Sequence, residues 1–146
     1  MDATLYFAYG SNMDEQQMSR RCPNAAVVGV ATLLGHQLII NTKGFATVVP
    51  LDTGVVIGLL WNLARTDEEA LDDYEGVGRG LYEKSMVVVQ THDGDKCRAL
   101  AYVATTSTMG APWKGYMERI VAAAERHDFP ATYVEQLRRW QRNDDR

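Results

Sequence analysis

The sequence has few of the residues on which metal sites and disulfide frameworks depend. It contains two cysteines, Cys22 and Cys97, which lie far apart and belong to no CxxC or CxxH pattern. Its three histidines, His36, His92 and His127, are isolated from one another along the chain. These absences argue against a zinc site and against a disulfide framework. We therefore expect no metal centre and two unpaired thiols.

Long apolar runs and clusters of basic residues are also missing. No apolar run approaches the roughly 18 residues that span a bilayer, and the start, Met1-Asp2-Ala3, lacks the basic region of a signal peptide. The net charge is −4 and no basic stripe is present, which argues against binding to a phosphate backbone. The sequence predicts a soluble, cytoplasmic protein with neither a membrane nor a nucleic acid as partner. It does not fix the oligomeric state, and a homodimer is among the states left open.

What is present is the composition of an ordinary globular domain. The 146 residues are 46% hydrophobic and 23% charged, which suits one domain with a proper core. No internal repeat and no linker interrupts the chain. We expect residues 1–146 to form a single domain.

Apolar and β-branched runs bounded by turn residues predict the strands. The first is the aromatic run that begins at Leu5 and stops at the turn residues Gly10, Ser11 and Asn12. The later runs are residues 25–34, 36–41, 45–50, 55–62, 81–90 and 96–104. Gly35 and the turn at residues 52–54 are the expected breaks, and Asp93-Gly94 predicts a hairpin between the last two runs.

Four segments have the pattern of helices. Residues 14–21 follow the first strand, and a helix capped by Thr66, with Glu69 completing a capping box, is expected to end near Glu75. Apolar residues recur at helical spacing from Pro112 to about Asp128, and Pro130 opens a last helix, with fraying expected over residues 141–146. The prediction is an α+β fold: a small mixed, barrel-like sheet of about six or seven strands with surrounding helices.

The stretch Tyr9-Gly10-Ser11-Asn12 is the first candidate for a functional site. A strand, a glycine turn and the start of a helix can point successive backbone amides at an anion. The alternative is an ordinary turn between a strand and a helix.

Glu75 is the second candidate, because it stands at the predicted end of a helix. An acid at that position meets the negative end of the helix dipole, which raises its affinity for a proton. A carboxyl with a raised pKa can act as general base and acid. The alternative is a surface glutamate. Tyr82, Tyr102 and Tyr116 are candidates for the wall of a site or for the core, and no nucleophile stands in a recognised context.

Taken together, these segments resemble the γ-glutamylcyclotransferase family. The likeness lies in Phe7-Ala8-Tyr9-Gly10-Ser11-Asn12, Gly44-Phe45-Ala46-Thr47, Val56-Ile57-Gly58-Leu59-Leu60-Trp61, and Tyr74-Glu75-Gly76-Val77 ahead of Gly80-Leu81-Tyr82. It extends through Tyr102 and Tyr116 and covers most of the chain. The resemblance implies a small mixed α+β barrel whose glycine loop and glutamate converge on one cavity.

The resemblance also implies roles for residues. Glu75 matches the catalytic carboxylate, and Tyr9, Gly10, Ser11 and Asn12 match the loop that holds the γ-glutamyl unit. Tyr82 and Tyr116 match aromatic positions that line the cavity. The implied reaction releases 5-oxoproline and a free amine from a γ-glutamyl small molecule, with no cofactor and no metal.

Two departures from the family pattern bear on the substrate. Asn12 stands where the glutathione-specific branch has leucine, and Tyr74 stands where several relatives have glutamine. The first departure favours γ-glutamyl amino acids, or a related biosynthetic γ-glutamyl amide, over glutathione. The polar connection at residues 105–111 is expected to form a mobile, uncharged rim with low selectivity for the leaving amine.

Two other functions remain compatible with the sequence. One is a non-catalytic module of the same fold that binds a γ-glutamyl compound or another small molecule. The other is a structural domain whose glycine loops only turn corners. Both catalysis and binding in one cavity require that Glu75 and the Gly10 amide lie within one ligand's length.

Overall fold

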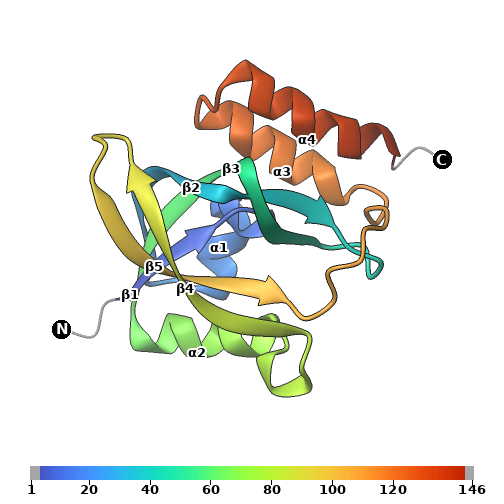
Figure 1. Ribbon diagram of the computed structural model, residues 1–146. Helices are drawn as coiled ribbons and strands as arrows, with labels where there is room; N and C mark the ends of the chain where they lie inside the picture. Colours follow the sequence, from blue (N-terminus) through green and yellow to red (C-terminus); the bar gives the residue numbers. More distant parts are fainter. Residues whose placement is uncertain (1–3, 144–146) are drawn as a thin grey trace.

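The computed structural model describes residues 4–143, in which five strands close into a barrel (Figure 1). The strands are β1 (Thr4–Ala8), β2 (Ala26–Ile40), β3 (Ala46–Leu63), β4 (Tyr82–Thr91) and β5 (Lys96–Ala104). Their order around the barrel is β1-β3-β2-β4-β5, and β1 closes it by pairing antiparallel with β3 and parallel with β5. The predicted α+β fold with a barrel-like sheet is confirmed.

The predicted count of six or seven strands is wrong, because β2 and β3 each join two predicted strands. Their ladder extends from Ala26 opposite Asn62 to Ile40 opposite Ala46, with one register shift between Val27 and Gly29 and a second between Leu34 and His36, beside Gly35. Gly35 has a φ of 77° and forms a bulge that bends the strand without ending it. The glycines that suggested breaks therefore mark bends within two long strands.

The predicted hairpin between the last two strands is present, and a second turn joins β2 to β3. The β4–β5 hairpin turns at Asp93-Gly94, where the Thr91 amide donates to the Asp95 carbonyl at 2.8 Å. The β2–β3 connection turns at residues 42–44, and the Gly44 amide donates to the Asn41 carbonyl at 2.9 Å. The site described below lies beside the second of these turns.

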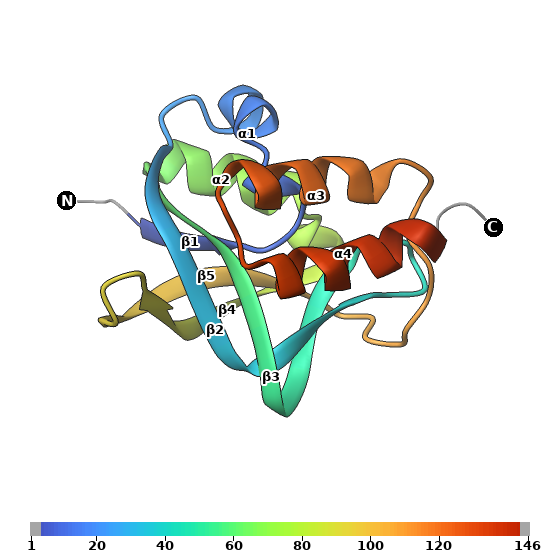
Figure 2. The same cartoon turned by 90° about the horizontal axis from the view of Figure 1, so that it is seen from above.

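Within the described residues, four helices and two short 3₁₀ turns surround the barrel. The helices are α1 (Glu15–Arg21), α2 (Arg65–Tyr74), α3 (Tyr116–Arg126) and α4 (Ala131–Asn143), and the 3₁₀ turns are η1 (Ser11–Met13) and η2 (Val77–Arg79). Helix α2 lies on one side of the barrel, and α3 and α4 lie side by side on the other (Figures 1 and 2). Helix α4 continues past the predicted fraying at Gln141, and residues 144–146 lie outside the described residues. Among the described residues, no helix is both long enough and apolar enough to cross a membrane.

Helix α2 matters most for the site because Glu75 follows its last residue. Its predicted cap at Thr66 is wrong: the N-cap is Ala64, and the buried Asp67 carboxylate accepts from the Ala64 amide at 3.1 Å. The same carboxylate accepts from the Asn24 amide at 3.4 Å. An acid at the third helical position can satisfy the N-cap amide without a capping hydroxyl. The predicted end is confirmed, since α2 ends at Tyr74 with Glu75 as its C-cap.

Candidate active site

The loop after β1 turns at Gly10 and enters η1. The Met13 amide donates to the Gly10 carbonyl at 3.0 Å. Gly10 has φ −122° and ψ −133°, and this ψ lies outside the usual regions of residues with a side chain. A Cβ at this position would lie 3.4 Å from the Ala46 Cβ and 3.6 Å from the Tyr116 hydroxyl. The loop thus brings the start of β3 and the start of α3 next to Gly10.

Asn12 connects this loop to helix α1. Its side chain is buried; Nδ2 donates to the Tyr6 hydroxyl at 2.9 Å, and Oδ1 accepts from Arg21 Nη1 at 2.5 Å. The Arg21 guanidinium also lies over the Tyr74 ring, 3.4 Å from its centroid. Arg21 therefore joins the glycine loop to the end of α2, immediately before Glu75.

Burial raises the pKa of Glu75 from its usual 4.5 to about 7, and the Arg21 cation acts in the opposite direction. The predicted direction of the pKa shift is confirmed, and its largest cause is burial. A carboxyl with this pKa is close to half ionised at neutral pH. It can therefore both accept and return a proton.

Two tyrosines form hydrogen bonds with the backbone of Ala46. The Tyr82 hydroxyl donates to the Ala46 carbonyl at 2.8 Å, and the Ala46 amide donates to the Tyr116 hydroxyl at 3.1 Å. Two further tyrosines tie the barrel together: Tyr9 donates to the Tyr102 carbonyl, and the Tyr102 hydroxyl donates to Asp72 at 2.6 Å. Burial raises the pKa of each of these four hydroxyls above its usual value, so all four are neutral at physiological pH.

These residues meet around one small cavity. It has a volume of about 30 Å³ and is lined by Tyr6, Tyr9, Gly10, Ser11, Asn12, Ala46, Glu75, Tyr82, Tyr102 and Tyr116. All seven residues proposed from the sequence for catalysis or substrate binding lie on its wall, and the role of each stays a prediction. The Gly10 loop and Glu75 therefore face one space.

Three residues that shape the site were not predicted from the sequence. Tyr6 and Ala46 line the cavity, and Arg21 acts on Asn12 and Glu75. Tyr6 gave no clear signal, because an aromatic residue within a strand is more often part of the core. Arg21 carried no signal, because a basic residue in the last turn of a helix is common.

A larger hollow lies elsewhere, between α4 and the bent part of the β2–β3 ladder. It has a volume of about 750 Å³, and its wall includes Gln37, Leu51, Val55, Tyr133 and Trp140. No carboxylate, imidazole or thiol lines it, so it offers no general base. The smaller cavity, in contrast, is lined by a carboxyl with a raised pKa and by five tyrosines.

Residues 105–111, which were predicted to form a mobile rim, are held by hydrogen bonds to a neighbouring turn. The Thr42 amide donates to the Thr108 carbonyl at 2.9 Å, the Gly110 amide donates to the Ile40 carbonyl at 2.7 Å, and Asn41 Nδ2 donates to the Thr106 carbonyl at 2.9 Å. These bonds fasten the connection to the β2–β3 turn. Within residues 4–143, no group of three or more His, Cys, Asp or Glu side chains is arranged to hold a metal ion.

Comparison with known proteins identifies the family. The model of the AIG2-like family matches residues 55–137. The chain is 29% identical to human γ-glutamylcyclotransferase over 98% of this chain and 81% of that protein. The chain belongs to the AIG2-like family, and its curated relatives from human, mouse and cattle are γ-glutamylcyclotransferases.

Solved structures agree with this assignment. A γ-glutamyl cyclotransferase superposes with a TM-score of 0.87 at 29% identity, over 93% of this chain and 86% of that one. A human protein described as uncharacterized superposes with a TM-score of 0.88 at 30% identity, over 94% of this chain and 88% of that one. YkqA from Bacillus subtilis has a TM-score of 0.84 at 25% identity, and the match covers 97% of this chain and 55% of YkqA.

Proposed function

We propose that this protein is a γ-glutamylcyclotransferase that converts a γ-glutamyl amino acid or γ-glutamyl amide into 5-oxoproline and the free amine. One observation carries the proposal: the Glu75 carboxyl, partly buried and with a pKa of about 7, lines the same cavity as Gly10, Ser11 and Asn12. The curated relatives named γ-glutamylcyclotransferase support it.

The reaction needs a base that can also act as an acid. The substrate's α-amine attacks its own γ-carbonyl carbon, a five-membered lactam forms, and the bond from that carbon to the leaving nitrogen breaks. Glu75 accepts a proton from the α-ammonium and returns it to the leaving nitrogen, and the regenerated carboxylate takes up the second proton that the attacking nitrogen loses as the lactam forms. The raised pKa of Glu75 brings the carboxyl closer to the pKa of the substrate's α-ammonium and so reduces the free-energy cost of the first transfer. Holding the substrate folded back on itself can supply an effective molarity of about 10⁵ M or more.

The remaining wall supplies hydrogen-bond donors for the substrate. In this proposal the amides of the 10–12 loop bind an anion, which is either the α-carboxylate or the oxyanion that develops on the γ-carbonyl. The Tyr6 and Tyr116 hydroxyls each accept a bond from a protein amide group. Among the described residues neither hydroxyl donates to a protein acceptor, so both can donate to a substrate oxygen.

The cavity must widen before a substrate can enter. A volume of about 30 Å³ is the share of one water molecule in the liquid, whereas pockets for small molecules have about 300–1,000 Å³. Substrate binding therefore displaces part of the wall. The γ-glutamyl unit then takes the place between Glu75 and the 10–12 loop.

The test is an assay of the purified protein with several γ-L-glutamyl amides, in which 5-oxoproline and the released amine are both quantified. We expect equal amounts of the two products and a loss of at least about 100-fold in kcat for Glu75→Gln, with substrate binding retained. Glu69→Gln, an exposed acid of α2, is the matched control and is expected to keep full activity. Activity of Glu75→Gln within tenfold of the parent would remove Glu75 from the mechanism. Binding without any 5-oxoproline would instead support the non-catalytic module of the same fold.

A further inference from the structure

Three segments form a continuous rim beside the cavity. Residues 41–46 end at the lining residue Ala46, residues 76–81 lie between Glu75 and Tyr82, and residues 105–115 lead into Tyr116. Hydrogen bonds join them: the Thr105 hydroxyl donates to the Gly80 carbonyl at 2.7 Å, and Trp113 Nε1 donates to the Lys43 carbonyl at 2.7 Å. We call these three segments the rim.

The rim exposes large apolar side chains. Phe45 is 42% exposed, Leu81 37%, Met109 59% and Trp113 62%. Phe45 also contacts the edge of the lining residue Tyr116, with ring centroids 5.6 Å apart. Apolar side chains gathered at the mouth of a cavity are typical of a binding surface. This surface is continuous with the cavity.

The rim is also positively charged. It contains the exposed residues Lys43, Arg79 and Lys114 and no aspartate or glutamate, although the whole chain has a net charge of −4. The Arg79 guanidinium packs against Gly76, because a Cβ on Gly76 would lie 2.9 Å from Arg79 Nη2. This cation therefore lies next to the residue that follows Glu75. The uncharged rim predicted from the sequence comprised residues 105–111 alone, and the three cations lie outside that range.

We infer that the rim selects the leaving amine: the site favours γ-glutamyl amides whose amine carries an apolar side chain and a carboxylate, and it disfavours amines with a positive charge. The inference rests on the proposed function, which places the γ-glutamyl unit against Glu75 and the 10–12 loop and leaves the rim for the amine. Apolar contact with Phe45, Met109 and Trp113 favours a large side chain. The cations Lys43, Arg79 and Lys114 attract a carboxylate and repel an ammonium group.

The expected effects are moderate because the rim is exposed to solvent. Partial burial of an aromatic side chain is expected to raise kcat/KM by about 5- to 20-fold over a methyl group. The contribution of exposed charges is expected to be about 2- to 5-fold and to decline as salt is added. A large effect from the charges alone would not fit their exposure.

The experiment compares four substrates with the same γ-L-glutamyl group, whose leaving amines are phenylalanine, phenylalaninamide, alanine and lysine bonded through its α-nitrogen. The readout is kcat/KM for 5-oxoproline release. We expect phenylalanine to be best, phenylalaninamide to lose the effect of the carboxylate, alanine to lose the apolar contact, and lysine to be worst. Met109→Gln is expected to reduce the ratio of phenylalanine to alanine.

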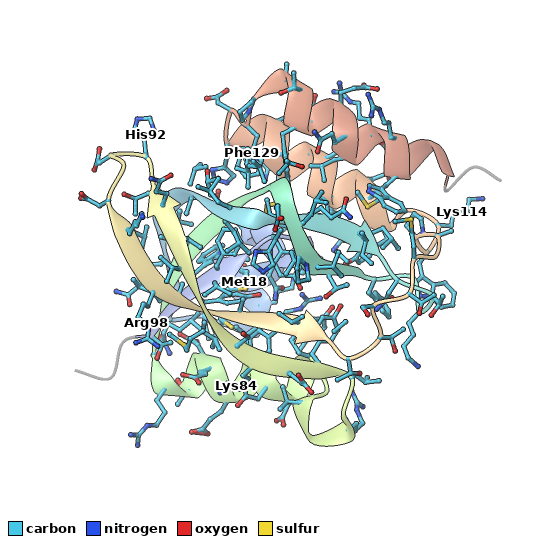
Figure 3. All side chains as sticks on the ribbon, in the orientation of Figure 1. Met18, Lys84, His92, Arg98, Lys114 and Phe129 are labelled. Atoms are coloured by element: carbon cyan, nitrogen blue, oxygen red, sulfur yellow. The ribbon has the colours of Figure 1, made fainter. Side chains whose placement is uncertain are left out.

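A charge reversal tests the electrostatic half of the inference. Arg79→Glu is expected to raise the ratio of lysine to phenylalanine turnover, whereas Arg98→Glu makes the same change at an exposed position of β5 and is expected to leave that ratio unchanged. Arg98 lies at the opposite end of the molecule from the rim residue Lys114 (Figure 3). Equal turnover of the four substrates, or a preference for lysine, overturns the inference about the rim and leaves the proposed function standing. Absence of 5-oxoproline from every substrate overturns both.

Discussion

Replacing Glu75 by glutamine is expected to stabilise the protein at alkaline pH while it removes activity. Burial raises the pKa of Glu75 from 4.5 to about 7, so between these values the folded protein holds a proton that the unfolded chain releases. Stability therefore falls as the pH rises through this window. Each pKa unit is equivalent to about 1.4 kcal/mol, so ionisation of Glu75 costs the folded state about 3 kcal/mol above pH 7. Glutamine has nearly the same shape and no charge to bury.

The assay is urea unfolding of the parent and of Glu75→Gln at pH 4 and at pH 8.5. The difference in unfolding free energy between the two proteins is expected to shift towards the variant by about 3 kcal/mol from the lower to the higher pH. Glu69→Gln, at an exposed position of the same helix, is the control and is expected to show little dependence on pH. A difference for Glu75→Gln that is the same at both pH values would refute the reasoning, because the carboxyl would then be as well solvated in the folded protein as in the unfolded chain.

Three further predictions concern activity. Arg21→Ala is expected to move the acidic limb of the kcat/KM profile to higher pH, because the Arg21 cation lowers the pKa of Glu75 and activity requires the ionised form. Arg20→Ala, in the same helical turn, is the control. An acidic limb that does not move in Arg21→Ala contradicts the role given to Glu75. Gly10→Val is expected to lose substrate binding with a modest loss of stability, because added methyl groups extend from a Cβ already in contact with Ala46 and Tyr116; unchanged affinity measured by calorimetry places the anion site elsewhere. The γ-D-glutamyl epimer of a good substrate can close the same ring but presents its α-amino and α-carboxyl groups in exchanged places, so we expect no 5-oxoproline from it, and equal turnover of both epimers would count against recognition of those two charges.

The strands show what the sequence could predict about the fold. Alternation and turn residues located every strand segment, but they did not show how many strands those segments form. Glycines such as Gly35 and Gly54 are typical of turns. At Gly54, however, an added Cβ would lie 2.1 Å from the His36 carbonyl oxygen of the neighbouring strand. Glycine there permits two backbones to approach at a bend. Whether a glycine ends a strand or bends it depends on pairing across the sheet, which a local pattern does not contain.

The site shows the same division between local and tertiary information. The end of α2 at Tyr74 and the turn at Gly10 were predictable because helix ends and glycine turns are local features. The stacking of Arg21 on Tyr74 was not, since it depends on how α1 packs beside α2. The cause of the raised Glu75 pKa is likewise tertiary: the helix end gave the right direction, but the burying residues come from β1, β4, β5 and α3.

The small volume of the cavity and the raised pKa of Glu75 have the same origin, and together they suggest an order of events. The carboxyl has a pKa of about 7 because protein, and not water, surrounds it. When the wall opens to admit a substrate, water reaches Glu75 and its pKa falls towards that of a solvated carboxyl. Glu75 is then ionised, as it must be to take the proton of the α-ammonium. When the wall closes over the bound substrate, water leaves and the pKa rises again, which makes the Glu75 carboxylate a stronger base towards the α-ammonium proton. Opening therefore ionises Glu75, and closure then raises its affinity for the proton that it must accept.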